Sequence, residues 1–166
     1  MTTSPVIHSV GKNHAVATLD GRLLVGLWVK TPFLDSVVEY HRAGTAAAKA
    51  FPEGIGFLTI ADRPGTPPDA ATRAEYAAML NEFRPVSRAS ALVITGGSAL
   101  GSSVVRGVAT GLMMMAQRSN LKTFGDIREA GAWLQVHAGA RGVQLPSAAD
   151  ITETVKILQA RVAEAA

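Results

Sequence analysis

The chain has 166 residues, a length that predicts one domain rather than two. Apolar residues make up 48% of the sequence and charged residues 17%, a balance that excludes a disordered chain and favours a compact core. Because there is no cysteine, disulfides, thiolate catalysis and cysteine-based metal sites are excluded, which agrees with a reducing cytoplasm.

The net charge of +3 does not come from a basic patch, since the 16 lysines and arginines are scattered among 13 acidic residues. We therefore expect no nucleic-acid partner. The most apolar stretch, residues 104–116, is interrupted by Arg106 and is shorter than the ~20 residues that a bilayer requires. Residues 1–5 lack the basic region of a signal peptide, so we expect a cytoplasmic protein without a membrane span.

The N-terminal part of the chain predicts a β-hairpin. Residues 14–18 and 23–29 are apolar runs separated by Asp20 and Gly21, which supply the positive φ values of a tight two-residue turn. Residues 6–10 are expected to form a further short strand. Because these segments are joined by short turns, they should pair as antiparallel neighbours.

Strand and helix patterns then alternate to the end of the sequence. Proline ends two of the helices, and Ser147 with Asp150 three residues later has the spacing of a capping box. The expected elements are a helix from Asp35 or Ser36 to Pro52, a strand at 55–60, a helix from the cap Asp69 to Pro85, a strand at 91–94, a helix at 102–118, a strand at 121–124 and helices at 127–137 and 148–163.

This order predicts an α/β fold, a single-domain mixed sheet with an N-terminal antiparallel hairpin, parallel strand-helix units and an extra C-terminal helix. In such a sheet, residues 55–60 should lie beside residues 91–94 as a parallel pair.

A glycine-rich turn follows the strand at 91–94 and raises the question of enzyme chemistry. The turn resembles the opening of short-chain dehydrogenases, but Leu100 and Ser102 stand where that pattern needs glycine. Leu100 also breaks a nucleophile elbow around Ser98. The histidines show no paired ligand spacing, so we predict no catalytic residue, no cofactor and no metal site.

The same turn offers a candidate site for a small anion, because backbone N–H groups point outward where a helix begins. The simpler alternative is that the serines cap the helix and the glycines permit the turn. The candidate ligand-binding residues are Gly96, Gly97, Ser98, Ser102 and Ser103.

The segment from residue 23 to the helix at 35–50, the strands at 56–62 and 91–95, and the ending from Lys122 to Leu134 resemble the STAS-type modules. This family includes anti-sigma-factor antagonists, the cytoplasmic tails of sulphate transporters and small bacterial proteins of the STAS or CRAL-TRIO-like type. The resemblance implies a STAS-like domain over residues 1–142, followed by a helical extension over residues 143–166.

The resemblance also implies a place for phosphorylation. In the antagonist branch, a strand ends in Asp and is followed closely by a phosphorylatable Ser or Thr. Here Asp62 is present, and Thr66 is the only hydroxyl in the loop that follows, so Thr66 is the candidate acceptor. The alternative is that the three prolines of residues 64–68 only stiffen a connection.

Two helices carry candidate interface residues. In the helix at 102–118, Arg106, Met113 and Met114 lie on a face that fits either a partner surface or core packing on two sides. The C-terminal helix has one narrow apolar stripe, which must dock on its own domain or on a second copy; exchange between subunits is slightly preferred. The stripe consists of Ile151, Val155, Leu158 and Val162.

We therefore expect a non-catalytic regulatory or protein-interaction module of STAS type. It would bind a protein partner or form a homodimer, with a small ligand as a modulator. The alternative is a small-ligand or lipid carrier, or a minor enzyme that uses the turn at residues 96–103.

Overall fold

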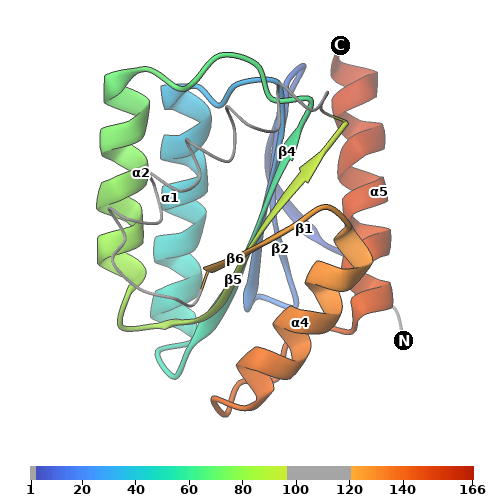
Figure 1. Cartoon of the computed structure of the whole chain (residues 1–166). Helices are drawn as coiled ribbons and strands as arrows, with labels where there is room; N and C mark the ends of the chain where they lie inside the picture. The colour runs from blue at the N-terminus through green and yellow to red at the C-terminus, as the bar shows by residue number, and fades with distance from the viewer. Residues whose placement is uncertain (1–2, 97–120) are drawn as a thin grey trace.

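A six-stranded mixed sheet lies at the centre of the computed structural model, which describes residues 3–96 and 121–166 (Figure 1). The strands lie side by side in the order of the sequence. They are β1 (Val6–Gly11), β2 (His14–Leu19), β3 (Leu23–Val29), β4 (Ile55–Asp62), β5 (Ser87–Thr95) and β6 (Leu121–Phe124).

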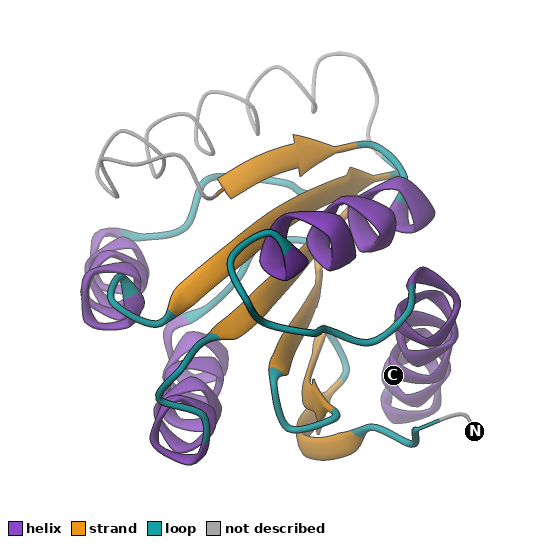
Figure 2. Cartoon of the chain, turned by 90° about the horizontal axis from the view of Figure 1, so that it is seen from below, coloured by secondary structure: helices purple, strands orange, loops and turns teal. Residues whose placement is uncertain are grey.

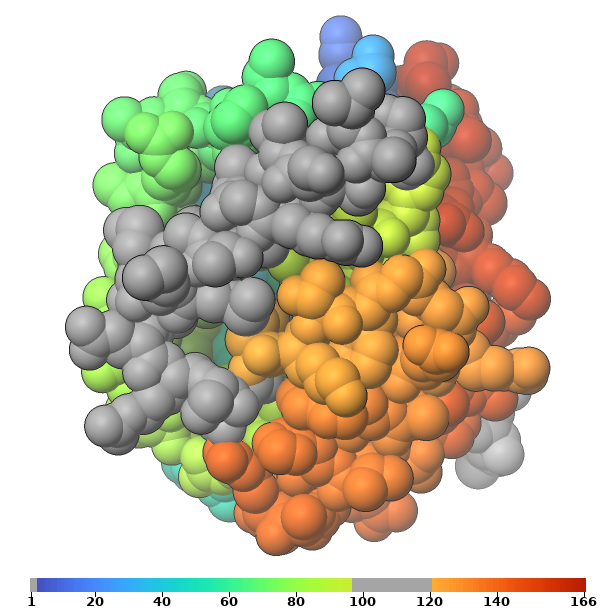
Figure 3. Space-filling view, in the orientation of Figure 1, coloured from blue at the N-terminus to red at the C-terminus, as the bar shows by residue number. Residues whose placement is uncertain are grey.

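The described helices cover the two faces of this sheet in pairs. One face carries α1 (Leu34–Ala50) and α2 (Ala70–Phe83), and the opposite face carries α4 (Ile127–Gly139) and α5 (Ala148–Ala165). Figure 2 shows the two pairs on either side of the strands. In Figure 3, the orange surface of α4 is continuous with the red surface of α5. The predicted α/β class is confirmed.

The predicted hairpin is also confirmed. β1 pairs antiparallel with β2, and β2 pairs antiparallel with β3 up to the partners Leu19 and Leu23. Asp20 (φ 55°) and Gly21 (φ 68°) have the positive φ values that the sequence predicts. The connection holds three residues rather than two, because Arg22 also lies between the last paired residues.

From β3 onward the pairing is parallel. β4 lies between β3 and β5, with Leu58 beside Ala91 and Ile60 beside Val93. The predicted neighbours at residues 55–60 and 91–94 are therefore confirmed. β5 in turn pairs parallel with β6.

Two apolar cores result from the alternation of side chains along the strands. In β3, Leu23, Val25 and Leu27 point toward α4 and α5. Leu24 and Trp28 point the other way, toward α1 and α2. Both faces of β3 are buried, which explains its continuous apolar sequence.

The helix caps agree with the sequence in two helices and differ in a third. Asp69 accepts a hydrogen bond from the Thr72 N–H at 2.8 Å, and Ser147 accepts one from the Asp150 N–H at 3.1 Å, both as predicted. The prediction that Asp35 or Ser36 caps α1 is wrong, because the residue before the first turn of α1 is Phe33.

Ser36 accepts a hydrogen bond from Trp28 Nε1 at 2.8 Å and donates one to the Phe33 carbonyl at 2.6 Å. Its side chain therefore links the end of β3 to the residue that precedes α1.

The C-terminal helix packs on the strands of its own chain. Ile151, Val155 and Leu158 are fully buried and Val162 is 5% exposed. Val143 and Leu145, in the connection before α5, belong to the same core. Residues of the expected helical extension therefore share one core with the strands. Pairing between subunits would have to keep these contacts by exchanging the helix.

Among the described residues, none of the helices is both long and apolar enough to cross a bilayer.

Candidate functional site

Three parallel strands end at the same level of the sheet. Val29 of β3 pairs with Asp62 of β4, which pairs with Thr95 of β5. In open α/β sheets, ligands bind outside the carboxyl ends of the strands, typically where the strand order reverses, whereas the strands of this sheet follow one another in sequence order. The carboxyl ends of these three strands are therefore a candidate binding surface.

The next residue of each strand adopts a left-handed conformation. Lys30 has φ 73°, Arg63 has φ 47° and Gly96 has φ 68°. The Lys30 N–H donates to the Asp62 carbonyl at 2.9 Å, and the Arg63 N–H donates to the Thr95 carbonyl at 2.8 Å. Positive φ is uncommon for lysine and arginine, so these bonds hold two basic residues in a costly geometry.

Besides its positive φ, the close approach of neighbouring side chains requires a glycine at residue 96. A Cβ atom there would lie 2.7 Å from Arg63 Cγ and 2.7 Å from Asp62 Oδ1. Of the predicted anion site, only Gly96 is described. The remaining members, Gly97, Ser98, Ser102 and Ser103, lie outside the described residues, as do the predicted interface residues Arg106, Met113 and Met114.

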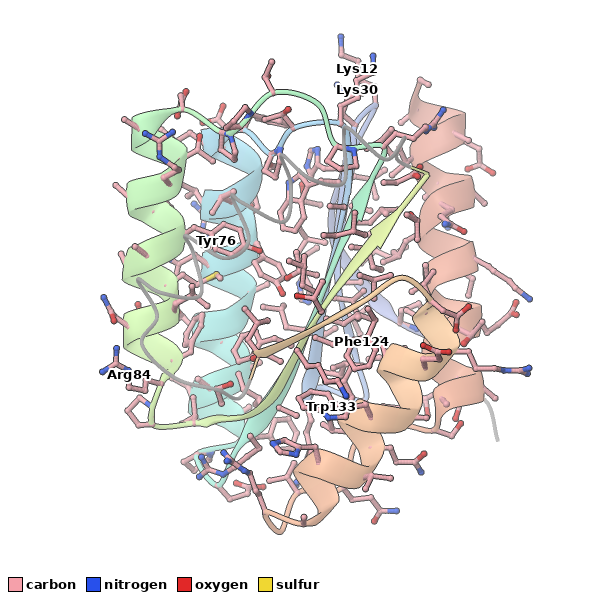
Figure 4. The ribbon with its side chains drawn as sticks, viewed as in Figure 1. Lys12, Lys30, Tyr76, Arg84, Phe124 and Trp133 are labelled. Carbon is pink, nitrogen blue, oxygen red and sulfur yellow. The ribbon has the colours of Figure 1, made fainter. Side chains whose placement is uncertain are left out.

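Positive charge gathers at this end of the molecule. Lys12 lies in the β1–β2 turn, where the carbonyl of the next residue, Asn13, accepts a hydrogen bond from the Val29 N–H at 2.8 Å. Figure 4 shows the Lys12 and Lys30 side chains extending together from the sheet. Arg63 is exposed on the neighbouring strand. We call Lys12, Lys30 and Arg63 the basic edge.

Of the acidic groups at this end, Asp35 is exposed in the first turn of α1, whereas Asp62 and Asp69 are engaged within the chain. Asp62 Oδ1 accepts a hydrogen bond from the Thr95 hydroxyl at 3.3 Å, and Asp62 Oδ2 lies 3.4 Å from Arg63 Nη2. Asp69 caps α2, and the hydrogen bond from the Thr72 N–H lowers the pKa of its carboxyl. The Asp62 and Asp69 carboxylates therefore have roles in the fold.

The candidate phosphorylation site lies in the loop after β4. Thr66 is exposed, and its carbonyl accepts a hydrogen bond from the Thr31 hydroxyl at 2.5 Å. Thr31 follows Lys30 directly, so the loop is tied to the chain beside the basic edge.

A second polar group, which the sequence does not predict, lies between α1, α2 and the sheet. The hydroxyls of Tyr40 and Tyr76 each lie 3.2 Å from the Thr59 hydroxyl. Trp28 packs edge-on against Tyr40, with ring centroids 5.2 Å apart. Burial raises the pKa of Tyr40 well above its ordinary value and that of Tyr76 to about 12. Both phenols are therefore neutral hydrogen-bonding groups at neutral pH.

A charged cluster joins α1 to α2. His41 donates from Nδ1 to Glu75 Oε1 at 2.6 Å and from Nε2 to Glu82 Oε2 at 2.5 Å. Burial alone would lower the pKa of His41, but the two carboxylates outweigh it and raise that pKa. The hydrogen bond from His41 lowers the pKa of Glu82. The cluster stabilises the contact between two helices.

Within residues 3–96 and 121–166, no group of three or more His, Cys, Asp or Glu side chains is arranged to hold a metal ion.

Comparisons with protein-family models, with curated proteins and with solved structures find no match for this chain.

Proposed function

We propose that the chain is a non-catalytic, regulatory module of STAS type that binds an acidic segment of a protein partner at the basic edge. The observation that carries the proposal is the alignment of Lys30, Arg63 and Gly96 at the ends of three neighbouring strands. Two of these residues carry positive charge in a left-handed conformation. Backbone strain of this kind is concentrated where proteins bind ligands.

The physical advantage of this edge is that its cations start from fixed backbone positions. Hydrogen bonds from the N–H groups of Lys30 and Arg63 to the adjacent strand hold both Cα atoms. Less conformational entropy is then lost when a carboxylate binds. Positive charge at one end of the domain would also steer an acidic partner to it.

The same charges favour a different protein over a second copy at this surface. Two basic edges facing each other across a two-fold axis would bring Lys12, Lys30 and Arg63 close to their own copies, and like charges repel. The homodimer that we expect from the sequence would therefore use another surface.

Phosphorylation of Thr66 would regulate this binding. A phosphate adds about −1.5 to −2 units of charge at neutral pH. Placed in the exposed loop beside Lys30, it would compete with the partner's carboxylates for the same cations. Thr66→Glu should therefore weaken the binding of an acidic peptide, whereas Thr66→Val should leave it unchanged.

The proposal is tested by titrating the ¹⁵N-labelled full chain with a blocked hexaglutamate peptide. The Lys30→Asn/Arg63→Asn variant removes two charges and keeps residues that tolerate positive φ. A matched control, Arg128→Gln/Arg141→Gln, removes two exposed charges from α4 and the connection that follows it.

We expect the first variant to lose about fivefold or more in affinity and the control to lose less than about twofold. The wild-type amide shifts should centre on residues 30, 63 and 96. Equal losses in the two variants, or shifts elsewhere, would contradict the proposal.

A further inference from the structure

A cavity lies beside the hydroxyls of Tyr40, Thr59 and Tyr76, between the sheet and the helices α1 and α2. About 60 Å³ of it is open to the centre of a water-sized sphere, which is room for more than one water molecule. Its other described walls are largely apolar and include Met79, Leu80 and Leu92. Figure 4 shows Tyr76 on the side of α2 that faces the sheet.

The three hydroxyls leave one proton without an acceptor among themselves. Each hydroxyl carries one proton, and two hydrogen bonds join the three oxygens: Tyr40 to Thr59 and Thr59 to Tyr76, each 3.2 Å long. Each bond uses one proton, whichever hydroxyl donates. One O–H therefore remains, in every arrangement, to donate to a molecule in the cavity.

The remaining polar side chain of the described wall is already partnered, since the Ser90 hydroxyl lies 3.1 Å from the Ser87 hydroxyl. No lysine, arginine or histidine is among the described lining residues. A carboxylate or phosphate would lose its hydration here and gain one hydrogen bond, which is unfavourable. A hydrocarbon would leave the O–H without an acceptor, which is also costly.

We propose that this cavity binds a small neutral molecule with an apolar body and one hydrogen-bond-accepting oxygen, such as a ketone or an ether. The oxygen would accept the remaining proton of the Tyr40–Thr59–Tyr76 group, and the apolar body would contact Met79, Leu80 and Leu92. This site is independent of the basic edge, since it lies between α1, α2 and the sheet rather than at the strand ends.

The test compares two probes of the same shape, cyclopentanone and methylenecyclopentane, by NMR titration of the full chain. The second probe replaces the carbonyl oxygen by a CH₂ group. The Tyr40→Phe/Thr59→Val/Tyr76→Phe variant removes all three hydroxyls and keeps both aromatic rings and the branched side chain at residue 59. Replacing all partners together by apolar groups of similar shape has little effect on stability.

We expect cyclopentanone to lose about three- to tenfold in affinity in the triple variant, while methylenecyclopentane changes by less than about twofold. Because the affinity of each probe for the variant is compared with the affinity of the same probe for the wild type, the difference in hydration between the two probes cancels. The proton count makes a further prediction: Tyr76→Phe leaves two hydroxyls and one hydrogen bond, so one proton remains free. This single variant should keep the wild-type affinity for the ketone to within about twofold.

A second measurement on the wild type keeps the proposal testable if the triple variant does not fold. In bound cyclopentanone, the methylene groups next to the carbonyl should give stronger nuclear Overhauser effects to the Tyr40 and Tyr76 rings than the distant methylene groups do. Reversed intensities, equal losses of both probes in the triple variant, or the absence of binding by either probe would overturn the proposal.

Discussion

The backbone N–H of Lys30 donates to the carbonyl oxygen of Asp62 at 2.9 Å and thereby joins the end of β3 to the end of β4. The same link recurs on the next strand, from Arg63 to Thr95 at 2.8 Å. In each bond, the donor lies one residue beyond the last paired residue of its own strand, and the acceptor is the last paired residue of the next strand. The two basic residues are therefore held in left-handed turns by the strands themselves.

The first prediction concerns the strain at Lys30. A β-branched residue fits a positive φ poorly, so Lys30→Val should lower the free energy of unfolding by about 1–2 kcal/mol, and Lys30→Gly should be neutral or stabilising. Lys12→Val is the matched control, because Lys12 is not among the residues with positive φ. Urea unfolding gives all three values. Equal stability of the two valine variants would mean that Lys30 is not strained.

The second prediction concerns Gly96. Gly96→Ala would place a Cβ atom 2.7 Å from Arg63 Cγ at a φ of +68°, so we expect a loss of about 1–2 kcal/mol. In contrast, Gly139 has nothing within 4 Å of its added Cβ and lies at the end of α4. Gly139→Ala should therefore stabilise the chain by about 0.5–1 kcal/mol, as measured by thermal or urea unfolding. The same sign for both substitutions would contradict this account.

The third prediction concerns the pH dependence of stability, in which two histidines act in opposite directions. The folded-state pKa of His41 is raised, so its contribution is fully present below the ordinary value of 6.5 and is lost as the pH rises through the folded pKa. Burial lowers the pKa of His14, so the folded state binds the proton less readily, and stability falls as the pH drops below 6.5.

Stability should therefore be greatest near the ordinary histidine pKa of about 6.5. In urea unfolding over a pH series, Glu75→Gln/Glu82→Gln should remove most of the decline on the alkaline side, because the carboxylates that raise the His41 pKa are gone. His14→Gln should reduce the decline on the acid side. A pH profile unchanged by both variants would show that other groups determine it.

The sequence was informative where a structure depends on neighbouring residues. Asp69 and Ser147 could be identified as caps because each bonds a backbone N–H three residues later. The start of α1 could not be identified in this way, since Ser36 is engaged by Trp28 from the preceding strand. The antiparallel pairs followed from apolar runs and turn residues that lie close together in the sequence, and the parallel pair of β4 and β5 followed from the alternation of strands and helices.

Neither polar site could be predicted from the sequence, because the members of each site are far apart along the chain. Thr59 lies 19 residues from Tyr40 and 17 from Tyr76, and only the packing of α1 and α2 on the sheet brings them together. The basic edge left a weak signal, since Lys30 and Arg63 each follow an apolar strand and precede a proline by one or two residues. Nothing in that signal indicates a positive φ.

The fourth prediction concerns the C-terminal helix. Leu158 is fully buried in the core that α5 forms with the strands, so Leu158→Ala should lower the free energy of unfolding by about 2–5 kcal/mol. If α5 packs on its own chain, the unfolding midpoint should not depend on protein concentration. A midpoint that rises with concentration would instead support the exchange of α5 between subunits.

The most direct test of the basic edge reverses its charge and that of the probe together. The wild-type chain should bind hexaglutamate and not hexalysine, with amide shifts centred on residues 30, 63 and 96. Lys30→Glu/Arg63→Glu should exchange the two preferences at the same amides, and both interactions should weaken between about 50 mM and about 200 mM salt. Continued binding of hexaglutamate by this variant, through the same residues, would contradict the proposal that the basic edge is the recognition surface.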